Sequence, residues 1–191
     1  MNSKDYITAV GYIILLRLLD LGLTFFYTPR LQYEWNPIVS VFGYSWLGML
    51  ITQVLIISFI IFVMSFYFLR KPLVNPPGDL SFNEYIYYYF HNKKRTNKKK
   101  LLDFNRRSID RVLAYNGFIF MTLAMSVSYL AIINNILVIG EVKSYSYFIY
   151  KYANIFYPSL LVLLAIFSFY LFFLLEYKYY KAKLVRFPAE Q

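Results

Sequence analysis

The chain has 191 residues, of which 59% are hydrophobic and 22% aromatic, and it carries a formal net charge of +10. A soluble domain of this size would expose much of that apolar content to water, so the composition excludes an ordinary soluble protein. The absence of cysteine excludes disulfides, thiolate metal sites and thiol nucleophiles.

Four long apolar stretches dominate the sequence, and a helix needs about 20 such residues to cross the bilayer core. They cover residues 7–28, 46–69, 112–140 and 153–175. The period-two alternation that is typical of membrane strands is missing from them. We therefore predict an all-α, polytopic membrane protein, in which residues 1–191 form a single transmembrane domain with four helices in a bundle.

The lysine and arginine residues are distributed unevenly between the two sides of these predicted spans. Sixteen of the twenty lie before the first span, within residues 70–111 or after the last span, and three lie on the opposite side. Because cytoplasmic flanks carry an excess of Lys and Arg, we predict cytoplasmic termini and short outer loops at 29–45 and 141–152. The net charge of +10 then follows from this topology and is not by itself a sign of nucleic-acid binding.

The first span carries an ionisable pair and a threonine on one helix face. Arg17, Asp20 and Thr24 are spaced i, i+3 and i+7. A carboxylate in hydrocarbon costs roughly 2.5–3.5 kcal/mol on insertion scales, so Asp20 should have either a partner or a function. Arg17 is a ready counter-ion one turn away.

The first outer loop contains a signal for a helix start. In the sequence Glu34-x-Asn36-Pro37, Asn36 fits the N-cap and Pro37 the first helical position. The apolar residues 38–42 would then form a short broken or re-entrant helix. Its positive N-terminal end would lie near Glu34 and near the carboxylate of the first span.

The second and third spans add amides at a similar depth. Gln53 lies seven residues below Trp46, which is roughly 10 Å along a helix. Asn134 and Asn135 lie one to two turns before the end of the third span. Because the second span runs inward and the third outward, three helices should bring polar side chains together beneath the outer surface.

The cytoplasmic segment 70–111 is predicted to contain a helix of its own. Ser81 and Glu84 fit a capping box, and the helix runs from Phe82 to about His91. Its aromatic residues, followed by a run of cations, favour an interfacial helix against anionic lipid headgroups. The cations are Lys93, Lys94, Arg95, Lys98, Lys99 and Lys100. The simpler alternative is that these charges only hold the loop inside the cell.

The fourth span is flanked by tyrosines, which is typical of the aromatic belts at membrane interfaces. Those at its outer end are Tyr145, Tyr147, Tyr150, Tyr152 and Tyr157. Pro158 is expected about one turn into the span, where a helix tolerates a missing donor.

The polar residues near the outer surface allow two interpretations. In the first, they bridge helices, with contacts that average about 0.6 kcal/mol each and fix which faces pack. Alternatively, they line a small pocket that binds a cation, a polar headgroup or a small solute. The candidate residues are Arg17, Asp20, Thr24, Glu34, Asn36, Gln53, Asn134 and Asn135.

No motif indicates catalysis or a cofactor. The sequence has no HExxH, no glycine-rich phosphate loop and no Asp-rich metal motif. His91 is the only histidine, so a metal site would have to be rich in carboxylates, and the sequence leaves open whether one exists. Asp20 and Glu34 form the only acid/base pair worth considering, and their separation is not fixed by the sequence. We predict no cofactor.

One pattern resembles a known family. Asp20-x3-Thr24, followed after nine residues by Glu34-x-Asn36-Pro and by an asparagine pair late in the third span, is similar to small prokaryotic multi-pass membrane proteins of unknown function. The similarity covers roughly residues 15–135. The resemblance implies a helical integral-membrane fold with an important polar motif. It does not imply any particular activity.

The function expected from the sequence is a non-enzymatic integral protein of the cell membrane. It would be a small subunit or scaffold of a membrane complex, with the outer polar cluster setting helix packing or holding a ligand. An apolar surface rich in Tyr and Phe suits contact with the bilayer, with other membrane subunits or with further copies of the chain. The alternatives are a small solute or ion transporter or channel, and a membrane enzyme acting on lipid headgroups.

Overall fold

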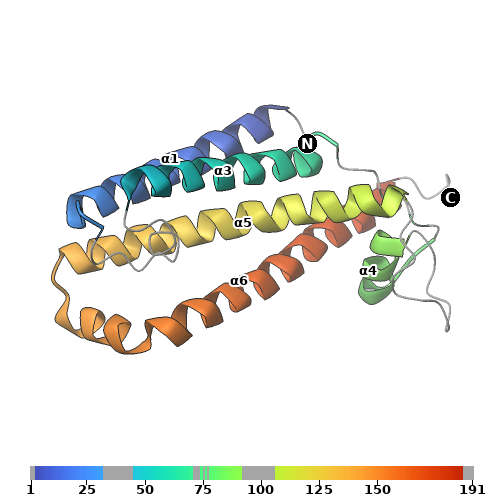
Figure 1. Cartoon of the computed structure of the whole chain (residues 1–191). Coiled ribbons are helices and arrows are strands. Elements are labelled where there is room, and N and C mark those ends of the chain that lie inside the picture. Colours follow the sequence, from blue (N-terminus) through green and yellow to red (C-terminus); the bar gives the residue numbers. More distant parts are fainter. Residues whose placement is uncertain are drawn as a thin grey trace.

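The structure is a computed structural model that describes residues 3–31, 45–70, 74, 76, 78–91 and 106–186 (Figure 1). Its helices are α1 (Ser3–Tyr27), α3 (Trp46–Phe68), α4 (Phe82–His91), α5 (Arg106–Ile139) and α6 (Lys143–Arg186). These described residues contain no strand. All of these helices except α4 are long and apolar enough to cross a membrane, which confirms the prediction of four helices able to span one.

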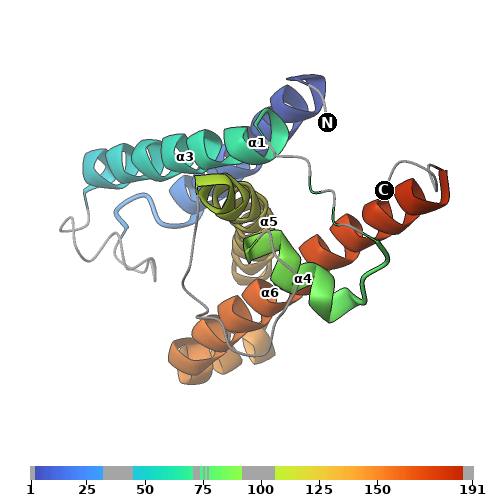
Figure 2. The same ribbon diagram turned by 90° about the vertical axis from the view of Figure 1, so that its right-hand side faces the viewer.

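Helix α5 is the centre of the arrangement. It packs against α1, α3, α4 and α6. The antiparallel pair α1 and α3 lies on one side of α5, and α6 lies on the other (Figures 1 and 2). The start of α1, helix α4 and the end of α6 share one end of the bundle, which we call the base, and the α5–α6 turn lies at the opposite, far end.

Helices α3 and α5 approach each other closely at a glycine. A Cβ atom added to Gly117 would lie 2.5 Å from the backbone oxygen of Val63, well inside van der Waals contact. The rings of Phe59 and Phe120 then meet edge to face at 5.6 Å on the same interface. A small residue at the contact is the usual way in which membrane helices gain close backbone packing.

An aromatic core joins four helices at the base. Tyr67 of α3 meets Phe118 of α5 with ring centroids 5.2 Å apart, and Phe118 meets Phe172 of α6 at 5.3 Å. Tyr89 of α4 meets Phe173 of α6 edge to face at 5.4 Å. Ring pairs of this kind contribute about 0.5–1.5 kcal/mol each beyond the burial of their area.

Helix α4 begins as its sequence predicts. The backbone N–H of Ser81 donates to Glu84 Oε2 at 2.9 Å, which is the returning bond of a capping box. The Ser81 hydroxyl also donates to this carboxylate, at 2.7 Å. The rings of Tyr85 and Tyr89 are buried in the protein, 1% and 0% exposed, so the headgroup layer does not account for them.

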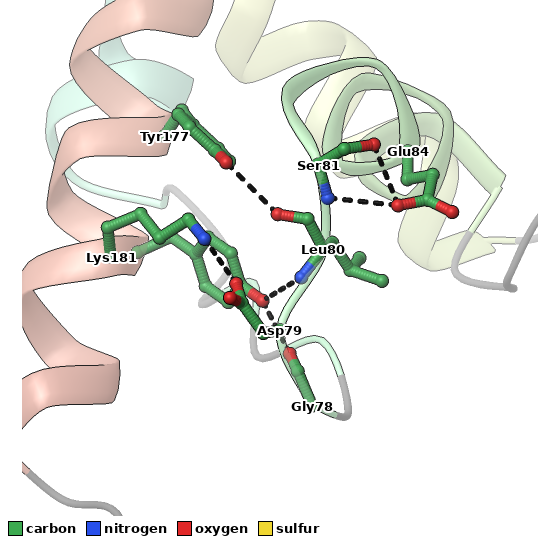
Figure 3. A network of polar contacts seen from close by, with 8 residues as sticks. Gly78, Asp79, Leu80, Ser81, Glu84, Tyr177 and Lys181 are labelled. Atoms are coloured by element: carbon green, nitrogen blue, oxygen red, sulfur yellow. Dashed lines mark hydrogen bonds and ion pairs between the residues drawn. The ribbon is translucent and has the colours of Figure 1, made fainter.

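The segment before α4 is tied to the last turns of α6 (Figure 3). The hydroxyl of Tyr177 donates to Leu80 O at 3.0 Å, and the N–H of Leu80 donates to the hydroxyl of Tyr180 at 2.9 Å. Lys181 forms an ion pair with Asp79. These contacts bring the entrance of α4 onto α6 and so position α4 across the base.

The predicted outer loop at 141–152 is wrong. Helix α5 ends in a Schellman motif, in which Glu141 adopts a left-handed φ of 53°. The N–H of Val142 bonds to Leu137 O at 3.2 Å, and the N–H of Glu141 bonds to Val138 O at 3.0 Å. This motif reverses the chain within a few residues, so α6 begins already at Lys143.

The early start of α6 also changes the place of Pro158. The proline lies well inside the helix and not in its first turn. It removes one backbone donor there, and the first part of α6 is bent relative to the rest (Figure 1).

Candidate functional site

The centre of the far-end polar network is Asp20 on α1. Arg17 Nη1, one turn earlier, donates to Asp20 Oδ2 at 3.3 Å. From α5, Asn135 Nδ2 donates to Asp20 Oδ1 at 3.3 Å and to Thr24 Oγ1 at 3.2 Å. One amide group thus bridges two side chains on the same face of α1, and the side chains of Arg17 and Asp20 are each only 14% exposed.

The network continues from α5 to α6. Asn134 Nδ2 donates to Asn135 Oδ1 at 3.5 Å. The hydroxyls of Tyr145 and Tyr157 both donate to Asn134 Oδ1, at 2.7 and 2.9 Å. The donors of α5 and α6 therefore point along one direction, from the tyrosines through the two amides to Asp20. Chains of hydrogen bonds that run in one direction strengthen one another in a low-dielectric interior.

The structure brings five of the predicted site residues into this network. They are Arg17, Asp20, Thr24, Asn134 and Asn135. Tyr145 and Tyr157 were not predicted to belong to it, because tyrosines at the end of a span are typical of an aromatic belt. For Tyr157 the available signal was its predicted depth, which is similar to that of the asparagine pair. Tyr145 lay in the predicted outer loop, so counting residues gave no such signal for it.

Gln53 does not hydrogen-bond to the network. Its side chain is 6% exposed, and its Oε1 atom has no hydrogen-bond partner in the described part of the chain. Glu34 and Asn36, with the predicted re-entrant helix, lie outside the described residues. The predicted headgroup-binding cations also lie outside them: Lys93, Lys94, Arg95, Lys98, Lys99 and Lys100.

The network holds an ion pair whose two charges balance each other. Asp20 is neutralised by Arg17, and the groups that connect it to the tyrosines are amides. An amide offers separate donor and acceptor atoms and does not pass a proton along as a hydroxyl chain does. Within the described ranges, no three His, Cys, Asp or Glu side chains gather as a metal site would require.

A second buried polar site lies at the base. Arg111 of α5 is 4% exposed and donates from Nη1 to Tyr88 O and Tyr89 O, at 3.2 and 3.1 Å. These carbonyls belong to the last turn of α4, where a cation satisfies acceptors and complements the helix dipole. In return, the hydroxyl of Tyr89 donates to Arg111 O at 3.1 Å.

The surroundings of the Arg111 site change the pKa of two tyrosines. Burial raises the pKa of Tyr85 and Tyr89, and the charge of Glu176 raises it further. Glu176 itself is only 6% exposed. Sequence reasoning missed this site because Arg111 counts as one more topogenic charge and Glu176 lies just beyond the predicted fourth span.

The comparisons with known proteins add no relative: no family model, no curated protein and no solved structure matches the chain. The resemblance based on Asp20-x3-Thr24 and Glu34-x-Asn36 therefore stays a prediction. The functional assignment depends on the geometry of the site.

Proposed function

We propose that the protein is a non-enzymatic, multi-pass protein of the cell membrane that acts as a small subunit or scaffold of a membrane complex. In this proposal the far-end network fixes the packing of α1, α5 and α6. The fixed helices present a defined apolar surface to other membrane subunits or to further copies of the chain.

The observation that carries the proposal is the bridge from Asn135 to Asp20 and Thr24. It joins α5 to α1 through two hydrogen bonds of 3.3 and 3.2 Å, and the carboxylate keeps its own counter-ion. A transporter that couples through Asp20 would need a route for water or protons to that carboxylate. The amides on its α5 side give support to a structural role instead.

The orientation in the membrane is part of the same proposal. Both termini and the base would be cytoplasmic, because sixteen Lys and Arg residues flank that side and three flank the other. Helix α4 would then lie at the level of the inner interface, docked on α5 and α6. The cations that follow α4 would contact anionic headgroups, each contributing at most about 1 kcal/mol.

The exposed surface of the spans suits lipid and protein neighbours. Large apolar side chains stand out on α1, α3 and α6, as at Phe26, Leu55 and Ile155, which are 78%, 65% and 70% exposed. In a membrane this area is covered by acyl chains or by partner helices. A rigid arrangement of the helices is what would let partner helices recognise it.

The test is recovery of partner subunits after mild extraction of the full chain from its own membranes. We expect Asn135→Leu to lower both the Tm and the amount of co-purified subunits. Asn116→Leu is the matched control on the same helix, because Asn116 Nδ2 bonds only within α5, to Val112 O at 2.9 Å. Equal Tm and equal recovery for the two variants would contradict the proposal.

A further inference from the structure

Gln53 of α3 is a buried amide with an unused acceptor. The residue is 6% exposed, and Oε1 has no hydrogen-bond partner among the described residues. A buried acceptor that receives no hydrogen bond in an apolar interior is among the most destabilising defects of a folded protein. A group that donates to this oxygen would remove the defect.

Arg17 of α1 has N–H donors that form no hydrogen bond among the described residues. Its guanidinium carries several N–H groups in a planar fork, and in the described part of the chain it makes one hydrogen bond, to Asp20. Its side chain is 14% exposed, inside a helix long and apolar enough to span a membrane. The remaining donors therefore have little access to water.

The contacts between α1 and α3 put Arg17 and Gln53 at a similar depth along the two helices. Towards the base, the hydroxyl of Tyr6 donates to Ile61 O at 3.1 Å. Towards the far end, Leu21 of α1 packs against the small buried cluster formed by Leu31 and Met49 of α3. The helices are antiparallel, so one turn towards the base leads from Leu21 to Arg17 and from Met49 to Gln53.

We propose that a hydroxyl group is bound between Arg17 and Gln53, accepting a hydrogen bond from the guanidinium and donating one to Gln53 Oε1. The ligand is neutral, because Asp20 already balances the charge of Arg17. Arg17 lies ten residues before the end of α1, roughly 15 Å along the helix, so a headgroup phosphate does not reach it. The hydroxyl belongs to an ordered water or to a small alcohol.

The sign of one substitution tests this site. With a bound hydroxyl, Gln53→Met removes a satisfied acceptor and lowers the Tm of the protein in nanodiscs. Without one, the same change removes an unsatisfied polar atom and raises the Tm. Thr52→Val is the control on the neighbouring position, because the Thr52 hydroxyl bonds to Gly48 O of its own helix at 2.9 Å. A raised Tm for Gln53→Met overturns the proposal.

A double-mutant cycle tests the bridge itself. Arg17→Lys keeps the charge beside Asp20 and removes the planar fork. If one hydroxyl joins Arg17 to Gln53, the effect of Arg17→Lys on the unfolding equilibrium constant should be smaller in the Gln53→Met background, by about five-fold. Strictly additive effects overturn the proposal.

Two further measurements separate the sources of the hydroxyl. A nuclear Overhauser contact between the ¹⁵N-labelled amide of Gln53 and the water resonance identifies a water. An added mass in native mass spectra that disappears in Gln53→Met identifies an alcohol. This inference goes beyond the scaffold proposal. Both measurements use the chain without partner subunits, so the hydroxyl site and the scaffold proposal can fail separately.

Discussion

Tyr89 and Arg111 exchange hydrogen bonds at the base of the bundle. The Tyr89 hydroxyl donates to Arg111 O at 3.1 Å, and Arg111 Nη1 donates to Tyr89 O at the same distance. The exchange joins α4, which follows the long helix α3 in the chain, to α5. It makes α4 a docked part of the bundle.

Removal of the arginine should release α4. In Arg111→Met, the last-turn carbonyls of α4 lose a charged donor, and hydrogen bonds of this kind contribute about 1.5–3 kcal/mol. We expect faster hydrogen–deuterium exchange in α4, with α1 and α3 unchanged. Tyr89→Phe should give a smaller effect, about 0.5–1.5 kcal/mol. Equal exchange in wild type and Arg111→Met would show that α4 is held by its rings alone.

The end of the bundle called the base should also become less stable at alkaline pH. The pKa of Tyr85 and Tyr89 is raised above the ordinary value of 10.0, first by burial and then by the charge of Glu176. With a raised folded pKa, the stabilisation is complete below about pH 10 and is lost as the pH rises through the folded pKa. We expect the Tm to fall above pH 10. The Tyr85→Phe, Tyr89→Phe variant should fall less steeply, and an identical slope would contradict the assignment.

The α3–α5 contact depends on Gly117. Gly117→Ala places a methyl group against the backbone oxygen of Val63 and should destabilise the bundle by about 1–3 kcal/mol. Gly22→Ala on α1 is the matched control, because its Cβ meets no atom within 4 Å. That change should stabilise the helix by about 0.5–1 kcal/mol. Thermal unfolding in detergent measures both, and a neutral Gly117→Ala would mean that the helices can move apart freely.

The scaffold proposal also has a consequence for transport. Because Asp20 is paired with Arg17 and faced by amides, Asp20→Asn should leave proton and ion leakage of protein-containing liposomes unchanged. The measurement compares wild type, Asp20→Asn and empty vesicles with a pH-sensitive dye. A flux that is present in wild type and absent in the variant would favour a transporter.

The spanning helices could be predicted from the sequence because bilayer thickness sets the length of an apolar run. The predicted 46–69 became α3 at Trp46–Phe68, and 7–28 became α1 at Ser3–Tyr27. The α5–α6 connection could not be predicted in the same way. Its C′ position is held by Glu141 in a left-handed conformation that usually indicates glycine, and no local pattern shows this.

The site was predictable where depth along a helix decides proximity. Asp20 and Asn135 could be placed at a common level by counting residues, and the structure joins them. Partners set by tertiary packing were beyond such counting. Tyr157 reaches the network across the α5–α6 interface, and the unused acceptor of Gln53 is visible only once its neighbours are in place.

The central claim, that Asn135 fixes α1 against α5, is tested most directly by a distance. Since the chain has no cysteine, spin labels can be attached at Leu19→Cys and Ile136→Cys, two exposed positions near the network. The account predicts a narrow distance distribution that broadens with Asn135→Leu and stays narrow with Asn116→Leu. An equally narrow distribution in Asn135→Leu would contradict it.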